Sequence, residues 1–179
     1  MSAQPIIKDN LEALDSGARL LQLLSDEQYN RVYSPYFSSS IGKHFRHILD
    51  HYLSFISGLN NCHVNYDQRD RDERLENDPG YALKIVNQIK DALIRINGEQ
   101  QSSYPLDRSI NVTLCTSTGP DTPPAGSTLQ RELVFLQGHT THHYAIIAAI
   151  LKLLNIPVDE RFGVAPSTLK YEEQSQCAQ

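Results

Sequence analysis

The chain has 179 residues, a length typical of one domain, and its 16 Lys and Arg against 21 Asp and Glu give a net charge of −5. This acidic balance argues against a protein that binds nucleic acid through a basic surface. No apolar run approaches the roughly 18 residues of a membrane span, and residues 1–5 lack the basic-then-apolar order of a secretory signal. We therefore expect one cytoplasmic domain over residues 1–179 that binds neither nucleic acid nor membranes.

The cysteines support the same expectation of an intracellular protein. Cys62, Cys115 and Cys177 are widely separated, odd in number and without a CxxC pair. They are expected to be reduced thiols, not a disulfide framework or a zinc ribbon.

Four segments carry apolar residues at the three- and four-residue steps of an amphipathic helix. They run from about Asn10 to Leu24, from Ser39 or Ser40 to Leu59, from Asn77-Asp78-Pro79 to Gly98, and from just after Ser127 to about Asn155. Serine, Asp or Asn before a helix and proline in its first turn are start signals, and proline shortly after a helix is a stop signal. The pattern predicts an all-α four-helix bundle, a fold that builds its sites from side chains on facing helices.

The segment between the third and fourth helices has a different texture. Residues from Ser109 to Thr116 alternate polar with β-branched or apolar side chains, which predicts a short strand or hairpin within a long crossover. The run from Tyr66 to Arg74 is dense in charges of both signs and is typical of a solvated loop or a helix start. After Pro157 we expect an extended, packed tail through Pro166, with the last few residues frayed.

The fourth helix carries the most informative histidines. On a helical wheel His139 and His143 face the apolar side one turn apart, and His142 lies at its edge. Imidazoles at positions i and i+4 can converge on one metal ion. The alternative is a pair of structural histidines, each of which must then find a hydrogen-bond partner away from water.

The second helix presents a matching stripe of histidines. His44, His47 and His51 are spaced three and four residues apart on one side of the helix. Small residues extend the stripe and leave room in front of the imidazoles: Ser40, Ser54 and Gly58. The wheel does not select one ligand and slightly favours His44 or His51, which lie nearer the buried arc. The alternative is a polar helix face that is rich in histidine.

Both histidine motifs resemble those of the DinB/YfiT-like metal-binding superfamily. The run from Ser40 to Asp50 looks like the family's second-helix signature, in which a serine or threonine beside an aliphatic residue precedes a ligand histidine by seven positions. This count selects His47, and the run from His139 to His143 is similar to the family's HxxxH on the last helix. The resemblance extends to the order of the four helices, the long crossover and the exit at Ile156-Pro157.

The chain departs from the family's pattern behind the last ligand. Many members have Arg-Gly-Gln there, whereas this chain has Tyr144-Ala145-Ile146, so contacts to substrate do not carry over from the resemblance. His44, His51 and His142 have no fixed place in the motif and are expected as alternative ligands or as partners that orient the ligands.

The resemblance implies a divalent metal ion, such as zinc, nickel or iron, that is held by His47, His139 and His143 with a coordination position open to substrate. Glu132 falls on the same side of its helix two turns earlier, where its carboxylate would act as a general base or orient a ligand; the alternative is a cap or rim residue. No catalytic residue is otherwise assigned. The absence of HExxH excludes a zincin, and the absence of a Glu-x-x-His pair argues against a di-iron carboxylate site.

Family members of known activity, as the resemblance implies, include transferases and isomerases whose metal binds a low-molecular-weight thiol, and others are classed as metal-dependent hydrolases. We therefore expect a metal-dependent transferase ahead of a hydrolase, acting on a small-molecule substrate, and a homodimer formed through exposed helix faces. Two alternatives differ in class. One is a non-catalytic metal-binding or stress-related interaction bundle whose ion is closed off by a fourth side chain, such as His44 or His51. The other is a helical dimer with structural histidines and no metal.

Overall fold

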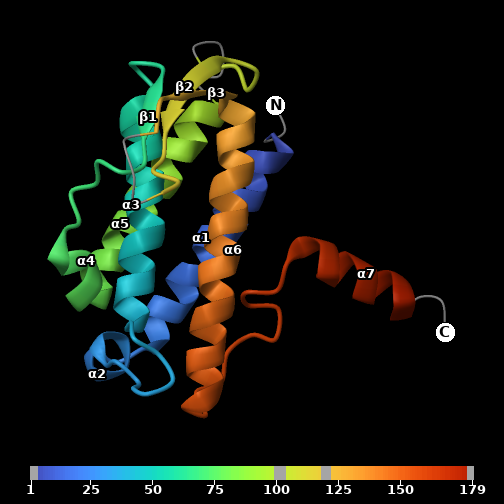
Figure 1. Cartoon of the computed structure of the whole chain (residues 1–179). Helices are drawn as coiled ribbons and strands as arrows, with labels where there is room; N and C mark the ends of the chain where they lie inside the picture. The colour runs from blue at the N-terminus through green and yellow to red at the C-terminus, as the bar shows by residue number, and fades with distance from the viewer. Residues whose placement is uncertain (1–3, 99–103, 118–121, 177–179) are drawn as a thin grey trace.

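The computed structural model describes residues 4–98, 104–117 and 122–176 (Figure 1). This part of the chain is mostly helical and carries one small three-stranded sheet. In chain order the elements are α1 Pro5–Leu23, α2 Asp26–Asn30, α3 Ile41–Gly58, β1 His63–Asn65, α4 Glu73–Asn77, α5 Pro79–Asn97, β2 Ser109–Thr113, β3 Ala125–Thr128, α6 Leu129–Leu153 and α7 Pro166–Gln176.

The four long helices α1, α3, α5 and α6 enclose the core. Helix α1 packs against α5 and α6, and α3 packs against the same two helices. Each long helix contributes side chains that are fully buried, such as Leu14, Phe45, Leu93 and Leu136. Burying a side chain of this size stabilises the fold by about 1.5–3 kcal/mol relative to leaving it exposed. The direct packing of α3 on α6 places the two histidine stripes opposite one another.

A buried polar network fixes α3 against α1 and α6. The Tyr52 hydroxyl donates to Asn10 Oδ1 at 2.7 Å, and Asn10 Nδ2 donates to the Leu133 carbonyl at 3.1 Å. Thr140 Oγ1 lies 3.4 Å from the Tyr52 hydroxyl. Tyr52 directly follows His51 and Thr140 directly follows His139, so this network sets the relative height of the two histidines along the helix axes.

The helix boundaries follow local capping chemistry. Ser40 Oγ accepts a hydrogen bond from the Lys43 amide, as the sequence predicts for the start of α3. Asp78 caps α5 in the same way, with Pro79 in the first turn. Helix α1 begins at Pro5, several residues before the predicted start, because this proline also suits a first turn. Helix α6 starts slightly later than predicted, because Thr128 is still in β3 and caps the helix.

The predicted strand is present and is part of a larger sheet. Strand β2 pairs antiparallel with β3, with Ile110 opposite Ser127, and parallel with β1, with Val64 opposite Val112. The β1–β2 connection contains α4 and α5, as a parallel pair requires a long crossover. The backbone amide of Tyr66 extends the pairing by donating to the Thr113 carbonyl at 2.9 Å. The loop that follows β1 is therefore fixed to the sheet at its first residue.

The C-terminal region differs in part from the expectation of an extended tail. Phe162 is buried and stacks on Tyr144, with the ring centroids 4.5 Å apart. Gly163, at φ 76°, allows the chain to lie directly on the backbone of α6. Beyond this contact the chain forms α7, which extends away from the helical body (Figure 1). A weak apolar pattern concealed this helix, because α7 has almost no buried face.

Two of the three cysteines lie in the described part of the chain. Cys62 and Cys115 are free thiols, whereas Cys177 and the expected fraying of the last residues lie outside the described residues. Among the helices of the described residues, none combines the length and apolar character needed to cross a membrane.

Candidate metal centre

Helices α3 and α6 bring five histidine side chains into one continuous cluster. The His47 ring centroid lies 4.5 Å from that of His51, 4.9 Å from that of His139 and 4.7 Å from that of His143. The His139 centroid lies 4.3 Å from that of His51 and 4.6 Å from that of His143. His44 joins at the edge, where its Nδ1 lies 3.0 Å from His143 Nδ1. Facing histidine stripes on these two helices are what the sequence predicts.

His47, His51 and His139 form a set of three side chains whose nitrogen atoms could hold one metal ion. One nitrogen from each of these side chains lies within 4.8 Å of the other two. His143 is in ring contact with two of them, but its Nδ1 shares a hydrogen with His44. The structure therefore brings together the three predicted ligands and adds His51 as a neighbour, so the choice among the four stays a prediction.

His51 is buried and already oriented as metal-binding histidines are. Its Nδ1 lies 2.8 Å from the carbonyl oxygen of His47. A carbonyl can only accept, so Nδ1 carries the proton and Nε2 has a free lone pair. A hydrogen bond from the second ring nitrogen to a backbone carbonyl is the usual way in which a protein fixes the ligating nitrogen.

His139 carries a nitrogen that lacks any protein partner. Its Nε2 is buried, and no residue of the described ranges donates to it or accepts from it. The Phe135 ring stacks on the imidazole with centroids 5.5 Å apart. An unsatisfied buried polar atom costs about 1–3 kcal/mol, and a metal ion would satisfy this one. The donor set thus fits a divalent ion with a preference for nitrogen ligands.

The cluster is electrically neutral at physiological pH. Burial is the main cause that lowers the pKa of His47 and His143 to about 3, and of His51 and His139 to about 4. Burial also lowers the pKa of His44. Neutral imidazole is the form that binds metals, so little proton release opposes binding near pH 7.

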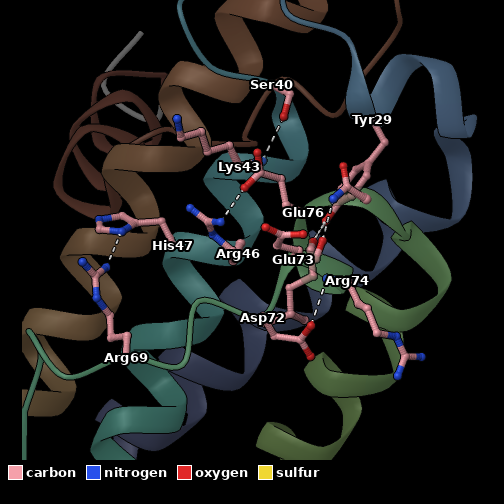
Figure 2. A network of polar contacts seen from close by, with 12 residues as sticks. Tyr29, Ser40, Lys43, Arg46, His47, Arg69, Asp72, Glu73, Arg74 and Glu76 are labelled. Atoms are coloured by element: carbon pink, nitrogen blue, oxygen red, sulfur yellow. Dashed lines mark hydrogen bonds and ion pairs between the residues drawn. The ribbon is translucent and has the colours of Figure 1, made fainter.

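Arg69 lies against this cluster, and sequence reasoning missed it. Figure 2 shows its side chain reaching from the loop before α4 to the His47 ring, where Nη1 lies 2.6 Å from His47 Nδ1. Arginine can only donate, so His47 Nδ1 accepts and the His47 proton is on Nε2. Arg69 Nε is buried and has no hydrogen-bond partner within the described part of the chain. Nothing in the mixed charge run from Tyr66 to Arg74 distinguishes this arginine from its neighbours, and the same run contains the fully buried Tyr66.

One buried carboxyl lies on the same helix as His47. Asp50 is 5% exposed, and burial raises its pKa while Arg69 and Arg46 lower it. Burial lowers the pKa of Arg69, and Asp50 offsets this in part. Asp50 and Arg69 are thus close enough to interact electrostatically, but they form no ion pair in the structure's described residues.

Glu132 is buried, and its contacts are with residues other than histidine. Its carboxylate accepts from the Tyr66 hydroxyl at 2.9 Å and from Ser127 Oγ at 2.5 Å, and it pairs with Arg131 at 3.3 Å. The Tyr66 ring in turn stacks on His51, with centroids 5.2 Å apart. Glu132 therefore reaches the cluster through Tyr66. Its proposed role as a base or an orienting group stays a prediction.

The remaining predicted residue, His142, points outward. It is exposed, and its ring lies 5.1 Å from that of His143. This position makes His142 a suitable control for experiments on the inner histidines.

Known proteins resemble this chain in sequence and in fold. The family model described as the DinB superfamily matches residues 12–147, a range that holds all the histidines of the cluster. FK506-binding protein 5 of Rhizopus delemar is 36% identical over 110 residues, which is 60% of this chain but 27% of that protein. The chain thus spans about a quarter of that relative's length.

A solved structure shows the same fold. The DinB-like protein YjoA of Bacillus subtilis matches with a TM-score of 0.63 at 18% identity, over 89% of this chain and 99% of that one. The family model covers well over half of the chain and the fold agrees, so the protein belongs to the DinB superfamily.

Proposed function

We propose that this protein is a metal-dependent enzyme that binds one divalent ion between α3 and α6. The observation that carries the proposal is the buried, unpartnered Nε2 of His139 within a cluster of neutral imidazoles. Zinc, nickel and iron all suit such a donor set. The proposed ligands are His47, His139 and His143, and His51 is the alternative that its burial and orientation favour.

The proposed reaction is group transfer, ahead of hydrolysis, on a small-molecule substrate with a low-molecular-weight thiol. Three imidazoles leave a coordination position open, and an ion there would hold a thiolate or polarise a substrate. His47 and His143 are only half-buried, which supports access to this position from solvent.

A non-catalytic metal-binding role is the second candidate. His47, His51, His139 and His143 each contact at least two of the other three rings, and four imidazoles are enough to complete the tetrahedral coordination of one ion. An ion closed off in this way would not accept a thiol or a substrate, and this difference can be measured.

The first experiment is metal analysis by mass spectrometry on protein purified without an affinity tag. We expect near-stoichiometric metal in the wild type, loss in the His47→Ala/His143→Ala double variant, and retention in the His142→Ala control. A wild type that neither carries metal nor takes it up on reconstitution would remove both metal-binding functions.

The two functions separate on the cobalt(II) form. A thiol such as 2-mercaptoethanol should change its visible and near-ultraviolet absorption if a coordination position is open. A spectrum unaffected by thiol would favour the closed, non-catalytic site. The single variants His51→Ala and His143→Ala, analysed in parallel, show which of the two imidazoles binds.

A further inference from the structure

We propose that Arg69 binds the carboxylate of a small ligand at the metal centre, and that metal binding frees Arg69 from His47 to do so. This inference rests on the proposed function, since it assigns the class of ligand that the same site accepts. It is carried by three features of Arg69: its contact with His47, its unpaired charge and its free Nε.

The contact with His47 cannot persist when His47 binds a metal. Arg69 donates to Nδ1, so a metal at Nδ1 would have to replace the guanidinium. A metal at Nε2 would require the ring proton to move to Nδ1, where it would face the N–H groups of Arg69. By either nitrogen, metal ligation releases the guanidinium.

The released charge has no carboxylate of the described residues within ion-pair distance. Arg69 is half-buried and forms no ion pair with any carboxylate of residues 4–98, 104–117 or 122–176. From beyond that distance, the carboxylates of Asp50 and Asp67 stabilise the charged form of Arg69, whereas the positive charges of Arg46 and Arg71 destabilise it. A divalent ion adds two more positive charges to a cluster of neutral rings. Because buried charges are costly unless paired, an anion that contacts both the ion and Arg69 would stabilise the loaded site.

The geometry of arginine selects a carboxylate. A guanidinium presents Nε–H and one Nη–H in parallel, and this fork matches the two oxygens of a carboxylate. The unpartnered Nε of Arg69 forms one such fork with Nη2, and release of Nη1 from His47 makes available a second fork, formed by Nη1 and Nη2. A single carboxylate also carries the one negative charge needed to balance one guanidinium. A ligand with a thiolate on the ion and a carboxylate on Arg69 would therefore fill the open coordination position and pair the guanidinium at the same time.

Two thiols of nearly equal size test this inference. 3-Mercaptopropionate and 2-mercaptoethanol differ by a carboxylate in place of a hydroxyl. Each is titrated into the cobalt(II) form, and thiolate-to-metal absorption gives its dissociation constant. We expect the wild type to bind 3-mercaptopropionate more tightly than 2-mercaptoethanol, by about tenfold or more, because hydrogen bonds between two charged groups are stronger than those between neutral groups. The ratio of the two dissociation constants is compared between variants. Any difference in how the two thiols bind the metal itself is the same in every variant and therefore cancels.

Arg69→Gln should abolish this preference, and Arg69→Lys should retain only part of it, since lysine keeps the charge but not the fork. Arg71→Gln is the matched control, because it removes the same charge from an exposed position of the same loop. Circular dichroism during thermal unfolding checks that each variant is folded.

Zinc affinity without added thiol gives a second readout. Arg69→Gln should bind zinc more tightly, by about tenfold, because a competing donor and a nearby positive charge are both removed. If Arg69→Gln changes neither the thiol ratio nor the zinc affinity while metal still binds, the inference is wrong and the proposed metal site stands. If the wild type binds no metal, both are wrong.

Discussion

The hydroxyl of Tyr66 donates a 2.9 Å hydrogen bond to the buried carboxylate of Glu132. The two residues come from different parts of the chain, the loop after β1 and the first turn of α6. Because the Tyr66 ring also stacks on His51, this pair links the start of α6 to the histidine cluster. Glu132 thus helps to hold the Tyr66 ring, and through it the His51 ring, in place.

Replacing Tyr66 with phenylalanine tests this link. The variant keeps the stacked ring but leaves a buried carboxylate with one partner fewer, so we expect a loss of about 1.5–3 kcal/mol in the free energy of unfolding. Urea denaturation measures the loss. Tyr104→Phe is the control, since the Tyr104 hydroxyl bonds Asn60 in an exposed position and should cost less than about 1 kcal/mol. Equal losses in the two variants would contradict the role assigned to the pair.

A second prediction concerns the buried hydrogen-bond network around Asn10. Asn10→Leu removes a donor and an acceptor, which leaves the Tyr52 hydroxyl and the Leu133 carbonyl without their partner. We expect a loss of about 2–4 kcal/mol. Tyr52→Phe in the same chain should recover part of this loss, because it removes one stranded group. Strictly additive losses in a double-mutant cycle would show that the two side chains are not coupled.

The stability of the metal-free protein should fall as the pH falls. The folded-state pKa values of His47 and His143 are about 3, and those of His51 and His139 about 4, below the ordinary value near 6.5. Below about pH 6.5 the unfolded chain therefore takes up protons that the folded chain does not, which favours unfolding. This contribution is absent above that pH and grows toward pH 3–4.

Urea unfolding in the presence of a chelator, from about pH 7.5 to about pH 5, measures this dependence. His139→Leu should give a shallower slope, because one of the groups is gone. A wild-type stability that stays constant over this range would contradict the burial of the imidazoles.

Gly163 should tolerate no side chain. At its φ of 76° a Cβ atom would lie 2.6 Å from the backbone nitrogen of Ala145, so Gly163→Ala must move the C-terminal segment off α6. We expect a loss of about 1–3 kcal/mol and faster proteolysis between Phe162 and α7. Gly138→Ala is the control, since it adds a methyl group to an open position of α6 and should be neutral or stabilising. Unchanged proteolysis in Gly163→Ala would show that this contact does not hold the segment.

Periodicity and capping were enough to predict the helices that carry the site. Ser40, Pro79 and the spacing of apolar residues act locally, so the wheel could place His139 and His143 on a core-facing side. The wheel could not predict the offset of α3 relative to α6 along their axes. This offset depends on Asn10, which bonds both Tyr52 of α3 and the carbonyl of Leu133 in α6, more than a hundred residues later in the chain. That offset decides whether His51 or His143 lies nearer to His139, and it explains why the choice of ligands stayed open.

The residues that sequence reasoning missed reach the site through non-local pairing. Tyr66 and Arg69 follow a strand of three residues, too short for any pattern to indicate, and that strand pairs with a segment almost fifty positions later. In the sequence these two residues look like part of a solvated run. Their approach to the histidines depends on β1 pairing in parallel with β2, an arrangement that local propensity does not encode.

The loop that carries Arg69 is fixed at both ends. At one end the Tyr66 amide bonds the sheet, and at the other Arg46 of α3 pairs with Glu76 of α4 at 2.6 Å (Figure 2). The loop residues that lie between Tyr66 and the start of α4, 67–72, contribute no ligand to the candidate metal site. This short segment is therefore suited to protein engineering. Substitutions confined to it should change which small molecules the protein prefers, while the histidines on α3 and α6 stay in position.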